Sequence, residues 1–403
     1  MNKIIISLDI IWSKKNYDTI IFKNGTIVIS ENQITVIGEI TPSESRTFST
    51  AYPANIDLYA DMKKNIQYSN AKIGDQCINL ETSQSHVLTW NSTDNLRGKI
   101  IMSWTLSELS YTYNTQQIDD FVILNLPFDR LAPKIIKSKN FIEDNAILVK
   151  NNSRYEFYKK QNINISAIKA YSDNKYAIDE MLIHLSFYLN VDVNVFMKSI
   201  YKENKINVSI FIPLFEMRDN ITYHPELIYM NIGENNGFEY FFKNSLWESI
   251  NNAQKEKLRQ AVYTFIRCKY CDNTMQFILL YSILDSYAGN SYGTSPYKTM
   301  KDNLYRYRID INKIGRENEP LLQKMQLYLK RDNGRNANVT NFCLLRNYIL
   351  HFMSSPQIDE YLKRSNIVSK LRFAVCVIIL NEFGFQNLSF KEGWQHLSIL
   401  KDK

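Results

Sequence analysis

Residues 1–165 alternate short apolar runs with clusters of Asn, Ser, Thr and Gly, which is the pattern of β-structure. Asn24-Gly25 is a dipeptide typical of tight hairpin turns, so we expect strands at residues 17–22 and 26–30 on either side of it. Further β-like runs occupy residues 34–38, 56–59, 77–80, 86–90, 99–104, 121–126, 208–214 and 227–232. Their spacing predicts a meander that continues into a sandwich or a barrel-like sheet.

Apolar residues recur at helical spacing in residues 172–199 and again throughout the C-terminal part of the chain. Ser245 and Glu248 fit a capping box, in which each side chain would bond a free backbone N–H at a helix start. The expected C-terminal helices cover residues 245–267, 274–287, 300–307, 319–329, 341–352 and 360–383.

These elements predict an α+β fold with two parts. A β-rich N-terminal region would cover residues 1–240 and include a helix near residues 175–199, and an all-α helical bundle would cover residues 245–403. The length of 403 residues suits two domains. The apolar stretches are shorter than the ~18 residues of a membrane helix, and no export signal is evident, so we expect a cytoplasmic protein.

Cysteine usage and charge add two further expectations. The five cysteines are odd in number and widely scattered, which favours reduced thiols over disulfide bonds. The formal net charge of +7 is mild, but residues 291–340 hold ten Lys and Arg against five acidic residues. Such a basic stretch either attracts phosphate or forms a solvated face.

Arg346, Asn347 and His351 stand close together in the expected helix at residues 341–352, as Arg-Asn, three residues and then His. This spacing resembles the R-x4-6-H signature of the HEPN superfamily, in which the residue after the Arg is usually Asn, Asp or His. The order of helices in residues 245–403 is also similar to that of a HEPN domain. Together with the β-rich region before it, the layout looks like that of ApeA-type anti-phage defence proteins.

The resemblance implies a metal-independent RNA endonuclease that needs no cofactor. HEPN nucleases pair two motif helices across a homodimer, so that two Arg and two His face one phosphodiester. The resemblance also implies a role in abortive infection, with a phage-derived trigger acting on the N-terminal region. The substrate would be RNA, with tRNA as one candidate.

The chemistry of the three residues fits this expectation. On a straight helix Asn347 and His351 share a face, whereas Arg346 lies about 100° away and must reach with its long side chain. RNA cleavage needs a proton taken from the 2'-OH, a proton given to the leaving 5'-oxygen and positive charge at the phosphate. We therefore expect His351 to move a proton, Arg346 to bind the phosphate and Asn347 to orient both.

Other interpretations stay open at this point. The bundle could be a non-catalytic dimerisation or nucleic-acid-binding module that senses a phage component or a partner protein. Cys268 and Cys271 have the spacing of half a zinc site, but no second pair of ligands completes it. His184, on an apolar helix face, is expected to be a hydrogen-bonded core residue. Asp285, in a very apolar helix, either positions Arg346 or faces the Gly/Ser-rich loop that follows.

Overall fold

The computed structural model divides the chain into two compact units. Unit 1 comprises Met1–Ile178 and Asn194–Asp219, and unit 2 comprises Asp179–Val193 and Asn220–Lys403. The structure describes residues 4–30, 33–51, 65–81, 87–95, 99–116, 119–126, 145–159, 166–171, 175–193, 195, 197–211, 237–289, 296–314, 346, 349–350, 359–360, 362–363 and 366–385. Among these residues, no helix combines the length and the apolar character needed to cross a membrane.

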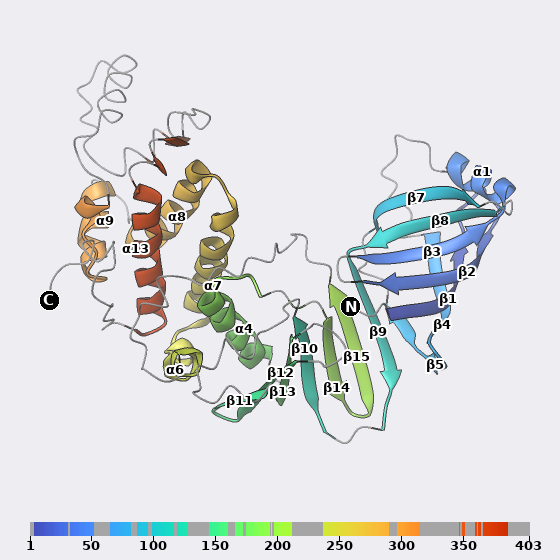
Figure 1. Ribbon diagram of the computed structural model, residues 1–403, viewed down its shortest axis with the longest axis horizontal. Coiled ribbons are helices and arrows are strands. Elements are labelled where there is room, and N and C mark those ends of the chain that lie inside the picture. The colour runs from blue at the N-terminus through green and yellow to red at the C-terminus, as the bar shows by residue number, and fades with distance from the viewer. Residues whose placement is uncertain are drawn as a thin grey trace, which may run out of the picture. The chain divides into compact units, whose positions relative to one another are not determined.

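Unit 1 consists of two sheets, sheet A and sheet B, in which neighbouring strands are antiparallel (Figure 1). Sheet A runs from edge to edge through β5 (Gln76–Cys77), β4 (Ile66–Ile73), β1 (Ile4–Trp12), β2 (Ile20–Ile29), β3 (Ile34–Ile40), β8 (Lys99–Leu106) and β7 (Val87–Asn95). Sheet B runs through β11 (Asn145–Lys150), β12 (Ser153–Lys159), β13 (Ser166–Tyr171), β10 (Phe121–Leu126), β14 (Met197–Lys202), β15 (Lys205–Phe211), β9 (Glu108–Asn114) and β6 (Asn79–Glu81).

The core of unit 1 forms because buried and more exposed positions alternate along β1, β2 and β3, with a change of phase in β2 at residues 23–24. Helix α1 (Pro42–Ala51) adds Phe48, whose ring centroid lies 5.3 Å from that of Trp12. The Phe22 ring lies 5.6 Å from that of Trp104 in β8. Residues of β9 and β15 belong to the same core, so both sheets contribute to it.

The predicted hairpin at Asn24-Gly25 is wrong, because β2 runs through this dipeptide as one strand. Asn24 adopts a left-handed φ of 53°, and a register shift between β2 and β3 marks a bulge here. A Cβ atom on Gly25 would lie 2.4 Å from the Leu8 carbonyl oxygen in β1, so only glycine fits. Between β2 and β3, Ser30 N–H donates to the Gln33 carbonyl at 2.9 Å.

The described part of unit 2 is helical, and the α+β class is therefore confirmed. Its elements are α4 (Lys175–Leu189), which enters unit 2 at Asp179, α6 (Gly237–Asn244), the 3-10 turn η1 (Trp247–Ser249), α7 (Asn252–Arg267), η2 (Cys268–Tyr270), α8 (Asn273–Ala288), α9 (Pro296–Tyr305), η3 (Ile311–Lys313) and α13 (Ile367–Glu382). Helix α8 packs against α7, α9 and α13 (Figure 1).

Two predicted helix boundaries are wrong. The capping box belongs to Asn251 and Gln254, which bond each other's backbone N–H at 2.9 and 3.1 Å, and α7 therefore begins after Asn251. The helix predicted at residues 360–383 is interrupted at Asn366, which has a left-handed φ of 55°. The very apolar helix predicted at residues 274–287 is confirmed as α8.

Several predicted elements fall outside the described residues: 56–59, 227–232, 319–329 and most of 341–352. The boundary near residue 240 stays a prediction, because residues 212–236 also lie outside them. Helix α4 was expected within the N-terminal region, and its sequence does lie between strands β13 and β14. From Asp179 onward, however, it is part of unit 2.

Candidate functional site

Arg346 is the member of the predicted Arg-Asn-His motif that the structure describes. It is helical and half-buried, whereas Asn347 and His351 lie outside the described residues. The Arg346 guanidinium carbon lies 5.6 Å from the ring centroid of Tyr281 in α8. That distance is within the range of a cation–π interaction, which holds a guanidinium over an aromatic face.

Tyr281 occupies a fixed position in the core of unit 2. Its side chain is only 5% exposed, and its ring stacks on that of Phe277 with centroids 6.1 Å apart and an interplanar angle of 29°. Helix α8 begins at a regular N-cap, where the Asp272 carboxylate accepts from Met275 N–H at 2.7 Å. The ring under Arg346 is therefore part of a well-anchored helix.

The C-terminal end of α8 is held by donors from α7, from α9 and from Arg306, which directly follows α9. Lys257 donates to the Ser286 carbonyl at 2.7 Å, and Arg306 donates to the Tyr287 carbonyl at 2.8 Å. Asn303 donates to the next carbonyl at 3.1 Å. The last carbonyls of a helix lack partners within the helix and carry partial negative charge, so these donors stabilise its end. Arg306, which belongs to the predicted basic stretch, therefore stabilises the end of α8.

A partly buried polar chain links the residues that follow α9 to α13 beside this helix end. Arg306 donates to the Tyr307 hydroxyl at 2.7 Å, and that hydroxyl donates to a Glu382 carboxylate oxygen at 2.6 Å. Burial, reinforced by Glu382, raises the pKa of Tyr307, so its hydroxyl stays protonated and can donate. The Tyr287 hydroxyl is also buried, and within the described residues it has no hydrogen-bond partner.

Asp285 agrees with the second of its two expected roles, because it faces the start of the Gly/Ser-rich loop. Its side chain is exposed, and its backbone carbonyl accepts from Gly289 N–H at 2.6 Å. A Cβ atom on Gly289 would lie 2.3 Å from the Asp285 Oδ1 atom. Gly289 therefore leaves the space that the carboxylate fills.

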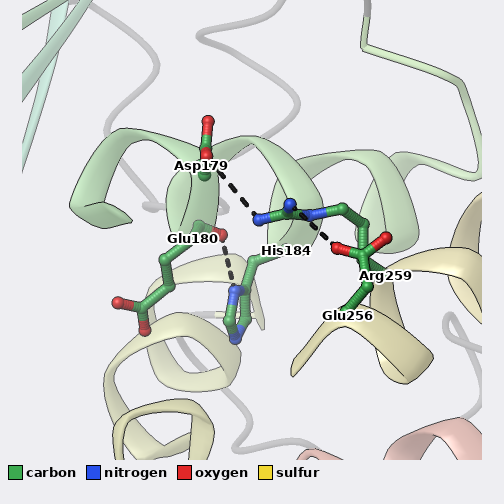
Figure 2. Close-up of polar contacts among 5 residues, drawn as sticks. All are labelled: Asp179, Glu180, His184, Glu256 and Arg259. Carbon is green, nitrogen blue, oxygen red and sulfur yellow. Dashed lines mark hydrogen bonds and ion pairs between the residues drawn. The ribbon is translucent and has the colours of Figure 1, made fainter. Parts of the chain in front are cut away.

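A second polar region joins α4 to α7 (Figure 2). Arg259 of α7 lies between two carboxylates: its Nη2 atom is 3.6 Å from Asp179 Oδ2 in α4, and its Nη1 atom is 3.2 Å from Glu256 Oε2. The side chains of Arg259 and Asp179 are 33% and 31% exposed. Water screens such pairs, so they set the register of the two helices more than they add stability.

His184 of α4 is completely buried, and both of its ring nitrogens are hydrogen-bonded. Nδ1 lies 2.7 Å from the Glu180 carbonyl oxygen, as Figure 2 shows, and Nε2 lies 2.7 Å from the Ser245 hydroxyl. A carbonyl can only accept, so Nδ1 carries a proton, and in a neutral imidazole Nε2 then accepts from the Ser245 hydroxyl. The surrounding aromatic rings are those of Phe241, Phe242, Trp247 and Phe383. The prediction of a hydrogen-bonded core histidine is confirmed.

Three cations hold the turn that follows α4. Arg267 bonds Asp192 through Nε at 2.8 Å and Nη2 at 2.7 Å. Lys269 donates to the Asn190 carbonyl at 2.5 Å, and Arg372 of α13 donates to the Asn190 side-chain oxygen at 3.0 Å. Burial, reinforced by the Arg372 charge, lowers the pKa of Lys269 from 10.5 to about 8.

The Cys268 and Cys271 pair spans the turn η2 at the end of α7. Cys268 is completely buried, its thiol donates to the Phe265 carbonyl at 3.0 Å, and Arg372 donates to its sulfur at 3.3 Å. Burial raises the pKa of this thiol. The described part of the chain contains no group of three His, Cys, Asp or Glu residues that could hold a metal ion.

No sequence pattern indicated directly that α4 belongs to the helical unit. An indirect signal was that its apolar residues occupy several faces of the helix, so they cannot all point to a single sheet. The buried ones include Ile178, Met181, Ile183, Leu185 and Phe187. The contact between Arg346 and Tyr281 was also not anticipated. No family model, no curated protein and no solved structure matches this chain.

Proposed function

We propose that this protein is a metal-independent RNA endonuclease of the HEPN type that acts in bacterial anti-phage defence by abortive infection. The observation that carries the proposal is the motif of Arg346, Asn347 and His351 in a chain whose described C-terminal part is helical. Support comes from the Arg346 guanidinium, which lies beside a ring of the core helix α8. A guanidinium held in this way can donate to two phosphate oxygens at once.

The three residues divide the chemistry of cleavage among them. A base removes the proton of the ribose 2'-OH, whose oxygen attacks the neighbouring phosphorus, and an acid protonates the leaving 5'-oxygen. His351 serves in one of these proton transfers, because imidazole gains and loses a proton near neutral pH. Arg346 stabilises the negative charge on the crowded phosphate, and Asn347 orients the other two side chains. The products are a 2',3'-cyclic phosphate, or a 3'-phosphate, and a 5'-hydroxyl.

One motif supplies a single Arg and a single His, so the proposed enzyme works as a homodimer in which two motifs face one phosphodiester. The β-rich region restrains the nuclease until a phage-derived signal arrives, because unrestrained RNA cleavage would harm the host. The basic residues after α8 add attraction for the RNA backbone.

The test is to incubate the purified protein with total bacterial RNA in the presence of EDTA and to map the ends of the fragments. A His351→Ala variant with the same thermal stability is the matched control. We expect the wild type alone to cut and to leave 2',3'-cyclic phosphate and 5'-hydroxyl ends.

Two outcomes would contradict the proposal. Cutting that EDTA abolishes would point to a metal-dependent nuclease. If neither protein cuts RNA, even with extract of infected cells added, and both still bind RNA, the result would favour the non-catalytic binding module.

A further inference from the structure

The two buried tyrosines of α8 each carry a cation against the ring, but the two cations differ in their surroundings. Lys257 lies 4.2 Å from the Tyr287 ring centroid and also donates to a backbone carbonyl at the end of α8. Arg346 lies 5.6 Å from the Tyr281 ring centroid and belongs to the motif to which we assign phosphate binding. The first contact completes a helix end, whereas the second involves a residue of the proposed site.

We infer that Tyr281 is a positioning residue for Arg346, which its ring holds in the orientation that binds the scissile phosphate. This inference rests on the proposed function. An aromatic face attracts a planar guanidinium and favours one orientation of it over the ring, so Tyr281 limits the directions in which the Arg346 N–H groups point.

The position of Tyr281 suits this role because the ring has little freedom to move. It is 5% exposed and stacked on Phe277 one turn earlier, in a helix packed against α7, α9 and α13. Positioning a reacting group in advance avoids the loss of side-chain entropy when substrate binds. The contact therefore acts on Arg346 in the free enzyme.

The ring, and not the hydroxyl, is the part of Tyr281 that the inference requires. Tyr281→Phe should keep cleavage close to the wild-type rate, because phenylalanine presents the same face to Arg346. Tyr281→Leu should lower kcat/KM about 10-fold, which is the magnitude of a partly buried cation–π interaction. Tyr287→Leu is the matched control, because it removes a ring of similar burial, 7% exposed, from the same helix.

The experiment measures initial rates of cleavage of total bacterial RNA in EDTA. It also measures the Kd of a non-cleavable 2'-O-methyl oligoribonucleotide of mixed sequence, and the thermal midpoint of every variant. The deciding comparison is a double-mutant cycle. Tyr281→Leu should weaken oligonucleotide binding in the wild-type background and have no further effect in an Arg346→Ala background, because Tyr281 acts through Arg346. A purely structural role would give equal losses in both backgrounds.

Each outcome separates this inference from the proposed function. If the wild type cuts and Arg346→Ala does not, but Tyr281→Leu behaves like Tyr287→Leu, the positioning role is overturned and the function stands. If Tyr281→Leu fails to fold, Tyr281→Met replaces it as the variant without a ring. If the wild type does not cut RNA in EDTA, both proposals fall.

Discussion

Two regions of unit 2 use arginine in different ways. In the seam between α4 and α7, Arg259 and Arg267 meet the carboxylates of Asp179 and Asp192. At the candidate site, Arg346 lies over the aromatic ring of Tyr281. A carboxylate attracts a guanidinium through its opposite formal charge, whereas an aromatic ring attracts it through the negative potential of the ring face. We therefore expect variants in the seam to change stability, and variants around Arg346 to change RNA binding and cleavage.

Removing α4 tests the structural side of the comparison most severely. A fragment of residues 237–403 keeps α6, α7 and α13 but loses Phe187, whose ring lies 5.9 Å from Phe241, 6.0 Å from Phe265 and 5.6 Å from Phe383. Each large apolar side chain of α4 contributes ~1.5–3 kcal/mol of burial, so we expect no cooperative thermal transition. Calorimetry and near-UV circular dichroism would show this.

The matched control joins residues 175–193 to the N-terminus of the same fragment through a flexible Gly/Ser linker. We expect this fusion to regain a sharp transition, because the linker lets α4 return to its place. A fragment that folds equally well without α4 would show that the seam is peripheral to unit 2.

The buried histidine gives the next largest effect. Ser245→Ala removes the partner of His184 Nε2, and His184→Phe removes the ring nitrogens from both Ser245 and Glu180. Each change should lower the free energy of unfolding by about 1–3 kcal/mol, because a buried polar group loses its partner. The double variant should lose less than the two single losses added together, since the Ser245 bond can be lost only once.

Denaturant unfolding of the four proteins measures this cycle, and RNA cleavage per folded molecule should be unchanged in all of them. A loss of cleavage without a loss of stability would show that His184 takes part in the proposed reaction and not only in the packing of the core. Additive losses would show that the bond between His184 and Ser245 contributes little.

Lys269 offers the smallest and most selective test, through pH. Burial lowers its pKa to about 8 in the folded protein, so between pH 8 and its ordinary value of 10.5 the unfolded chain holds the additional proton. The contribution of this group to stability therefore rises with pH across that window. We expect the thermal midpoint of the wild type, relative to Lys269→Met, to be higher at about pH 9.5 than at about pH 7.

Other groups titrate in the same window, including the nearby Cys268 thiol, so only the difference between the two proteins is interpreted. Lys301→Met, at an exposed position of α9, is the control and should leave the difference between the two pH values near zero. A wild-type advantage that shrinks with rising pH would contradict the assignment.

Local pattern was sufficient where an element buries one clear set of side chains. The alternation in β3 and the apolar run of α8 are of this kind. Predictions from local pattern were wrong where a residue distant in sequence determines the local conformation. Asn24-Gly25 has the composition of a turn, but the approach of Leu8 makes it a bulge within β2. Ser245 is a residue type that often caps helices, but its hydroxyl is hydrogen-bonded to His184 Nε2 instead.

The candidate site shows the same division. The motif of Arg346, Asn347 and His351 was visible because its members are neighbours in sequence. The contact between Tyr281 and Arg346 could not be predicted, because it depends on which turn of α8 packs against Arg346. Single-residue propensities carry no information about that packing. A tyrosine in an apolar helix reads as an ordinary core residue until its neighbour is known.

The chain order of α4 has a consequence for synthesis on the ribosome. Helix α4 emerges between strands β13 and β14, long before α6, α7 and Phe383, whose aromatic rings pack against it in the finished protein. A growing chain can complete the strands of sheet B before the aromatic residues that surround His184 have been synthesised. The helical unit then closes only after α13 has been made, so an interrupted chain would carry the sheets without a completed helical unit.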